Sequence, residues 1–294
     1  MKQVWFITGS SRGLGRSITI AALEAGHHVA ATARNPQQLA NLEAQYPGQL
    51  LPVRLDVTDY KQVHQAVADT VAHFGRLDVV VNNAGFGITG ATEGFTDEQV
   101  RSQLETNLYG PIEVTRAVLP YLRKQGSGRI LQISSIGGRT GNAGLSIYQA
   151  AKFGLGGFSE ALAKEVAHLG IHVTSVEPGG FRTDWAGNSM SYAPKVEGYD
   201  NVSMIEDILS SGKFKPMGDP DKAAKVITDL AVHPNPPVHL VLGSEAVALL
   251  EQANASRDAE LAHWKPISVT TDADDAENFF ESAASQLVSK AKGL

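Results

Sequence analysis

Residues 4–15 read VWFITGSSRGLG, and this stretch decides the fold. It opens on four apolar residues, as expected for a strand that is covered on both faces. Three glycines follow with the spacing Gly-x-x-x-Gly-x-Gly, and a helical pattern comes next. Glycine lets the backbone turn tightly and approach a diphosphate, and a helix N-terminus offers N–H groups to an anion. The stretch therefore predicts a dinucleotide phosphate loop, with candidate contacts at Gly9, Ser11, Arg12, Gly13, Leu14 and Gly15.

The same residues also match Gly-x-Ser-x-Gly, the nucleophile elbow of α/β-hydrolases. That fold needs an earlier strand and loop to supply the donors for the oxyanion. Only eight residues precede Gly9, so we favour the phosphate loop.

Short β-rich runs alternate with helical patterns along the rest of the chain. The candidate strands are Val4–Ile7, Val29–Ala33, Leu50–Leu55, Val79–Val81, Arg129–Ile133, Val173–Val176 and Val238–Leu242. Several are apolar throughout, which is typical of parallel strands buried between two layers of helices. The order predicts an α/β fold: a Rossmann-like, doubly wound parallel sheet of about seven strands with helices on both faces, a three-layer sandwich.

We expect one domain over residues 1–294, with two additions. Residues 179–220 interrupt the alternation and are predicted to form a substrate-binding lid; ordinary core packing by two short helices is the alternative. Large apolar residues are scattered along this segment: Trp185, Met190, Tyr192, Tyr199, Met204, Phe214 and Met217. Residues 265–294 are predicted to be a C-terminal appendage with one helix.

Composition excludes several function classes. Twenty-five basic against 31 acidic residues give a net charge of −6, without the basic excess of nucleic-acid-binding modules. The chain has no cysteine, which excludes disulfides, thiolate metal sites and cysteine nucleophiles. Since no apolar run approaches the ~20 residues of a membrane span or forms a signal-peptide core, we expect a cytoplasmic protein without nucleic-acid or membrane partners.

The second predicted strand ends at Ala33–Arg34, where an NAD site would present Asp or Glu to the ribose. A guanidinium binds a 2′-phosphate by paired hydrogen bonds, whereas a carboxylate repels it. Arg34, with Arg12 from the phosphate loop, therefore favours NADP, and NADPH over NADH. Each arginine alone could equally be a solvated surface side chain.

A tyrosine and a lysine lie four residues apart at Tyr148 and Lys152, on one face of a predicted helix. A nearby ammonium favours the phenolate and so lowers the pKa of a tyrosine. Alone the spacing is weak, since a core tyrosine beside a solvated lysine has the same pattern. Ser135, at the end of the fifth predicted strand, precedes Tyr148 in a position where ligands bind in parallel sheets.

In this order the motifs resemble those of the short-chain dehydrogenase/reductase family, single-domain type. The matching residues cover roughly the first 185 positions: the glycine loop, Asp56, Asn82–Gly85, Asn107, Ser135, Tyr148-x-x-x-Lys152, Pro178–Gly179 and Thr183. The resemblance implies a small carbonyl or alcohol substrate, no metal in the chemistry, and a homodimer or homotetramer.

The resemblance also implies a role for each matching residue. Tyr148 would donate a proton to the carbonyl oxygen during reduction, and Ser135 would hydrogen-bond that oxygen. Lys152 would lower the Tyr148 pKa and bind the nicotinamide ribose, and Asn107 would hold a water in a proton relay. The remaining cofactor contacts implied are Asp56 and Val57 at the adenine, Asn83, Ala84 and Gly85 at the adenosine ribose, and Pro178, Gly179 and Thr183 at the nicotinamide. From the lid we expect Trp185 and Met190 to contact substrate.

Three functions remain in competition. The first is an NADP(H)-dependent carbonyl reductase or alcohol dehydrogenase acting on apolar, bulky ketones, aldehydes or secondary alcohols. The second is a catalytically silent NADP-sensing protein on the same fold, because fold does not determine function. The third is an epimerase or dehydratase, although such relatives are generally longer.

Overall fold

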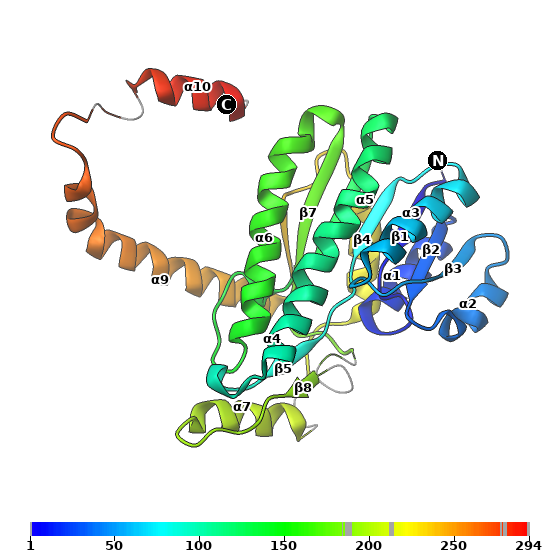
Figure 1. Cartoon of the computed structure of the whole chain (residues 1–294), viewed down its shortest axis with the longest axis horizontal. Helices are drawn as coiled ribbons and strands as arrows, with labels where there is room; N and C mark the ends of the chain where they lie inside the picture. Colours follow the sequence, from blue (N-terminus) through cyan, green and yellow to red (C-terminus); the bar gives the residue numbers. More distant parts are fainter. Residues whose placement is uncertain are drawn as a thin grey trace. The chain divides into compact units, whose positions relative to one another are not determined.

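Seven parallel strands form the central sheet of the computed structural model, in the order β3-β2-β1-β4-β6-β7-β9 (Figure 1). The structure describes residues 2–183, 185, 190–211, 215–276, 278 and 281–292. The strands are β1 (Val4–Ile7), β2 (His28–Ala33), β3 (Leu50–Arg54), β4 (Val79–Asn82), β6 (Gly128–Ile133), β7 (Ile171–Pro178) and β9 (His239–Leu242). The predicted doubly wound parallel sheet is confirmed, with strand bounds shifted by one or two residues. The strand order reverses between β1 and β4, which is where ligands bind in such sheets.

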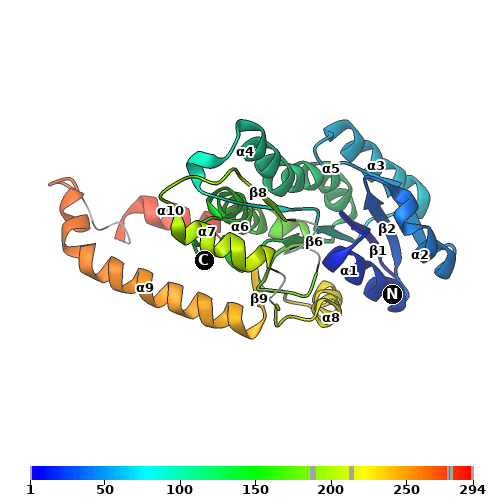
Figure 2. The same cartoon turned by 90° about the horizontal axis from the view of Figure 1, so that it is seen from below.

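Two layers of helices cover the sheet, one on each face (Figure 2). The first includes α1 (Gly13–Glu24), α2 (Ala40–Gln45) and α8 (Pro220–Ala231), and the second includes α3 (Tyr60–Phe74), α5 (Gly110–Gln125) and α6 (Ser146–Val166). Helix α4 (Asp97–Leu104) leads into α5 through η3 (Glu105–Tyr109), a π-helical turn. The short 3-10 turns are η1 (Pro36–Leu39), η2 (Thr92–Gly94), η4 (Ile136–Gly138) and η5 (Ala167–Leu169).

Strand β1 shows why a continuous apolar run is needed at the centre. Val4 and Phe6 belong to the core cluster under α3, α5 and α6, whereas Trp5 and Ile7 belong to the cluster under α1 and α8. Successive strand residues point to opposite faces, so both faces of β1 must be apolar. Each such side chain contributes roughly 1.5–3 kcal/mol when fully buried.

Helix ends follow the residues expected for them. The Asp59 side chain accepts hydrogen bonds from the backbone N–H groups of Lys61 and Gln62 at the start of α3, and Gly75 ends that helix with φ of +79°. Thr96 and Gln99 form a capping box at the start of α4. These local signals set the lengths of the helices that lie between the strands.

Residues 179–220 contain β8 (Met190–Tyr192) and α7 (Asp200–Ser210), and β8 pairs in parallel with β5 (Gly87–Thr89). Phe214, one of the predicted lid residues, lies outside the described residues. The role of this segment as a lid remains a prediction.

The chain divides into two compact units, Met1–Leu249 and Leu250–Leu294. Helix α9 (Ser244–Ser268) crosses this division, and η7 (Val269–Thr271) and α10 (Ala283–Lys292) follow it. The single-domain interpretation with an appendage at 265–294 remains a prediction. No helix among the described residues has both the length and the apolar character that crossing a bilayer requires.

Candidate active site

A cavity of about 700 Å³ runs along the carboxyl ends of the parallel strands. It collects residues that immediately follow β1, β2, β3, β4, β6 and β7, as expected for a ligand site in this topology. Its lining includes every site residue predicted from the sequence except Asn107 and Met190. At about 700 Å³ the cavity lies within the range of cofactor and small-molecule sites.

The glycine loop forms one wall of this cavity. Gly9 and Gly13 have φ of +68° and +54°, in the left-handed region where a side chain is strained. Gly15 is needed for a different reason. A Cβ there would lie 2.3 Å from both the Gly9 carbonyl oxygen and Asn83 Nδ2. The loop can therefore close onto β4 only when residue 15 has no side chain.

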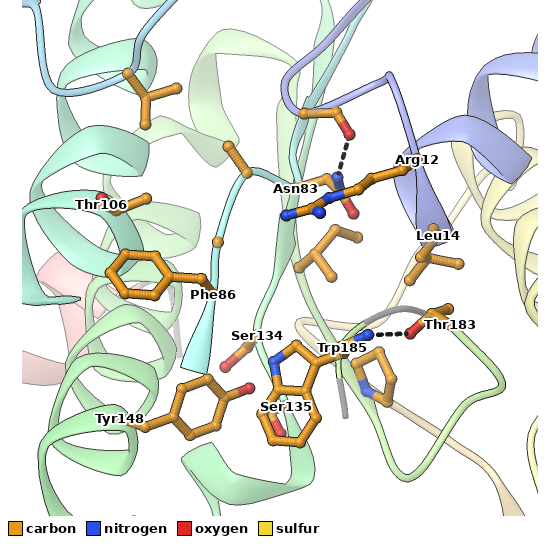
Figure 3. A pocket seen from close by; sticks show the side chains of 18 of the residues that line it. Arg12, Leu14, Asn83, Phe86, Thr106, Ser134, Ser135, Tyr148, Thr183 and Trp185 are labelled. Atoms are coloured by element: carbon orange, nitrogen blue, oxygen red, sulfur yellow. Dashed lines mark hydrogen bonds between the residues drawn. The ribbon is translucent and has the colours of Figure 1, made fainter. Parts of the chain in front are cut away.

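The ends of β1 and β4 are tied together beside this loop. The Thr8 hydroxyl oxygen accepts hydrogen bonds from the Asn83 and Ala84 N–H groups at 2.9 and 3.0 Å. Asn83 Nδ2 donates to the carbonyl oxygens of Thr8 and Gly9 at 3.0 and 3.1 Å (Figure 3). Asn83 thus fixes the glycine loop, a structural role that the sequence motif alone did not reveal.

The residues present fit a dinucleotide. Helix α1 begins directly after the loop, and within the described part of the chain no side chain caps its N-terminus and its first turn has no acidic residue. Its leading N–H groups therefore remain available to an anion. Arg12 and Arg34 are exposed, and neither is ion-paired with a described carboxylate. Asp56 accepts hydrogen bonds from Thr58 at 3.0 and 2.7 Å, so its carboxylate is held at the cleft wall.

At the other end of the cleft lie Tyr148, Ser135 and Lys152 (Figure 3 labels the first two). Tyr148 and Lys152 are 5 % exposed and come from α6, while Ser135 begins the η4 turn after β6. The Ser135 hydroxyl lies near the phenol of Tyr148 and acts to lower the Tyr148 pKa. Lys152 Nζ donates to the carbonyl oxygen of Ile133 at 2.8 Å and lies 5.8 Å from the centre of the Tyr148 ring.

Burial controls the titration of this pair. It raises the pKa of Tyr148 to about 12, although the Ser135 hydroxyl acts in the opposite direction. It lowers the pKa of Lys152 to about 8. That Lys152 lowers the Tyr148 pKa remains a prediction. Burial disfavours the ammonium form of Lys152 as well as the phenolate form of Tyr148. Loss of hydration therefore sets the direction of both pKa shifts.

Asn107 lies in the π-helical turn η3 and is fully buried. Its Nδ2 donates to the Phe86 carbonyl oxygen at 2.8 Å, and its Oδ1 accepts from the Phe86 N–H at 3.1 Å. Both amide atoms thus hold the chain after β4 against the end of α4. The water relay implied for Asn107 remains a prediction.

Of the two predicted substrate contacts, Trp185 lines the cleft and Met190 does not. The Trp185 ring lies 5.4 Å from the Tyr148 ring, at 58° to it. Met190 is buried beside Gly87. A Cβ added at Gly87 would lie 3.1 Å from both the Met190 and the Trp185 side chains. Sequence reasoning missed other lining residues: Phe86, Ser102, Glu105, Thr106, Ser134, Phe181, Ser191 and Pro216. Ser134 directly follows β6, a signal that could have identified it.

Comparison with known proteins agrees with this geometry. The short-chain dehydrogenase family description matches residues 3–192 of this chain. The chain belongs to the short-chain dehydrogenase family. It is thus an oxidoreductase on a Rossmann-like fold.

Relatives match this short-chain dehydrogenase over most of its length. Oxidoreductase BOA17 from Botryotinia fuckeliana is 45 % identical over 273 residues, covering 92 % of this chain and all of the relative. A 3-ketodihydrosphingosine reductase from Bacteroides thetaiotaomicron is 37 % identical over 244 residues, covering 82 % of this chain and 88 % of the relative.

Solved structures show the same fold. A short-chain dehydrogenase from Streptomyces avermitilis superposes with a TM-score of 0.87 at 41 % identity, covering 92 % of this chain and 98 % of that chain. ElxO with NADP bound has a TM-score of 0.71 at 27 % identity, covering 84 % of this chain and 100 % of that chain. NADP-bound proteins are therefore among its structural neighbours.

Proposed function

We propose that this chain is an NADP(H)-dependent reductase of ketones or aldehydes, with Tyr148 as the proton donor. The observation that carries the proposal is the buried phenol of Tyr148, which lines the same cleft as Ser135, Lys152 and the glycine loop. When bound, the nicotinamide coenzyme supplies the hydride that reduces the carbonyl carbon.

The protein's own groups manage the oxygen of the substrate. The Ser135 hydroxyl donates a hydrogen bond to the carbonyl oxygen and polarises it. Because its pKa is about 12, Tyr148 is protonated at neutral pH and ready to donate as negative charge develops on that oxygen. Lys152 Nζ lies 5.8 Å from the centre of the Tyr148 ring, and its amine holds the end of β6 through Ile133.

The preference for NADPH over NADH rests on Arg12 and Arg34. Both guanidinium groups line the cleft and lack an ion pair among described residues, so they can receive a 2′-phosphate. ElxO, a structural neighbour, binds NADP. We assign the loop Gly9–Gly15 to the diphosphate and Asp56 to the adenine.

The substrate we propose is neutral, apolar and bulky. Trp185 and Phe86 flank the Tyr148 end of the cleft (Figure 3), and Phe181 and Pro216 add further apolar lining. Apolar side chains around the reacting end of a cleft favour such ligands. The relative from Bacteroides thetaiotaomicron is named a 3-ketodihydrosphingosine reductase, which agrees with a ketone as the reacting group.

A homodimer or homotetramer would use the outer faces of η3, α5 and α6. Tyr109, Tyr121 and Phe153 are exposed there at 52 %, 37 % and 42 %. Aromatic residues are enriched at protein interfaces. Sedimentation velocity gives the oligomeric state, and a monomer at micromolar concentration would rule this assembly out.

Replacing Tyr148 by Phe tests the proposal. We expect turnover of aryl ketones, followed by loss of NADPH fluorescence, to fall by ~10²–10⁴-fold, because proton donation contributes about that much. NADPH binding should persist, since the ring remains. Tyr46→Phe is a matched control outside the cleft and should keep full turnover. An active Tyr148→Phe enzyme refutes the role of Tyr148, and tight NADPH binding by the unmodified protein without turnover would favour the sensor.

A further inference from the structure

A second buried charge cluster lies behind the catalytic end of the cleft, centred on Glu177. This residue is fully buried near the carboxyl end of β7, directly before Pro178 and Gly179. Its Oε2 pairs with Arg139 Nη1 at 3.1 Å, and its Oε1 accepts from the Ser175 hydroxyl at 3.1 Å. His239 Nδ1 lies 2.6 Å from the same Oε1. A fully buried carboxylate requires such partners, because an unpaired charge there is very costly.

The partners of Glu177 come from the elements that build the site. Arg139 is the C-cap of the η4 turn, and Ser135 is its N-cap. His239 begins β9, opposite Ser175 of β7, and its Nε2 lies 3.9 Å from Glu160 of α6, the helix that carries Tyr148. One carboxylate thus joins the turn that holds Ser135, the strand end that lines the nicotinamide side, and the neighbouring last strand.

The position of the η4 turn is also restricted by its contacts with α6. A Cβ at Gly138 would lie 2.8 Å from both the Lys152 carbonyl oxygen and the Ser134 hydroxyl, so the turn presses directly on α6. At its start the Ser135 hydroxyl accepts a hydrogen bond from the Gly137 N–H at 2.9 Å. Its far end is held to β7 through the pair of Arg139 with Glu177. A change at Glu177 therefore moves the turn relative to Pro178 and Gly179.

We infer that Glu177 is a positioning residue for the reduction: through Arg139 it sets the distance between the Ser135 hydroxyl and the strand end that carries Pro178 and Gly179. The inference rests on the proposed function, in which Ser135 binds the carbonyl oxygen and that strand end lies against the nicotinamide. Small errors in the distance between reacting groups cost much rate, since a displacement of ~1 Å can cost ~10²-fold.

The test compares Glu177→Gln with the unmodified full-length protein in two measurements. The first is turnover with NADPH and with NADPH deuterated at the transferred position. We expect kcat to fall by roughly 10- to 100-fold with KM for NADPH nearly unchanged, and the deuterium isotope effect on kcat to rise, because hydride transfer becomes slower than the other steps. A purely structural loss lowers the amount of active enzyme and leaves the isotope effect unchanged.

The second measurement is hydrogen–deuterium exchange without coenzyme. Peptides spanning residues 134–140 should exchange roughly tenfold faster in Glu177→Gln, because a hydrogen bond to a charged group is lost from the end of the turn. Arg139→Gln changes the partly exposed partner and should give the same two results if Glu177→Gln does not fold. Glu113→Gln is the matched control: Glu113 pairs with Arg116 and His64 at 2.6 and 2.7 Å but does not line the cleft.

Each result has a definite reading. Unchanged exchange at 134–140 in a folded variant, or a loss of kcat with an unchanged isotope effect, overturns the inference, as does the same response from Glu113→Gln. If the unmodified protein reduces no carbonyl compound, the proposed function fails, and the exchange data still decide whether Glu177 holds the turn.

Discussion

Lys152 offers a direct physical test of the buried site. Its side chain is enclosed, and burial lowers its pKa from the ordinary 10.5 to about 8 in the folded protein. In the unfolded chain it titrates near its ordinary value. Between these two values the unfolded state binds more protons than the folded state. The free energy of unfolding contributed by Lys152 therefore rises with pH across this window.

The size of the effect follows from the shift. A difference of ~2.5 pKa units at ~1.4 kcal/mol per unit is about 3 kcal/mol. Below pH 8 the folded protein carries the whole cost of burying the ammonium, and by about pH 10.5 that cost has disappeared. Lys152→Met has no such group. The stability of the unmodified protein minus that of Lys152→Met should therefore rise by about 3 kcal/mol between pH 7 and 10.5.

Tyr148 acts in the opposite direction but cancels in this comparison. Its pKa of about 12 means that the folded protein keeps the phenol proton where the unfolded chain loses it. Its contribution therefore lowers stability as pH rises above about 10, and it does so in both proteins.

Urea unfolding without coenzyme, followed by far-UV circular dichroism at several pH values from 7 to 10.5, measures the difference. Lys164→Met is the control, because Lys164 is 63 % exposed on the same helix, and its stability should run parallel to that of the unmodified protein. If the Lys152→Met curve is also parallel, Lys152 titrates as it does in water and the account of the buried pair is refuted.

Two further predictions concern the coenzyme end of the cleft. Arg34→Asp should raise KM for NADPH by roughly 10- to 100-fold, the value of a lost hydrogen bond between charged groups, and should change KM for NADH little. Steady-state kinetics with both coenzymes measure this, and Arg54→Asp at the end of β3 is the control. An equal rise of KM for both coenzymes contradicts the assignment of Arg34 to the 2′-phosphate. Gly15→Ala should weaken NADPH binding at least tenfold and lower stability by ~1–3 kcal/mol, because its Cβ would lie 2.3 Å from the Gly9 carbonyl oxygen. Gly157→Ala, at an exposed helical position with no atom within 4 Å of its Cβ, should leave binding unchanged, and normal NADPH affinity in Gly15→Ala would show that the loop tolerates a side chain.

Much of the site was predictable because its residues follow strand ends. In a parallel sheet all carboxyl ends meet at one edge, so Gly9, Arg34, Asp56, Asn83 and Ser135 had to converge once the strands were recognised. Met190 does not line the cavity, because the pairing of β8 with β5 buries it beside Gly87. That pairing joins residues a hundred positions apart, and no local pattern signals it.

The sequence by itself determined the layered α/β architecture and the identity of the chemical groups, because strand periodicity, helix caps and glycine spacing act between near neighbours. Only the tertiary structure decided the pKa values of these groups and the partners that hold them in place. The pKa of Tyr148 moves upward and that of Lys152 downward because distant elements exclude water from both. Glu177, the one acidic residue of β7, acquires its partners from a turn and a neighbouring strand. Burial and charge pairing depend on which segments meet in space, so they arise only when the chain has folded.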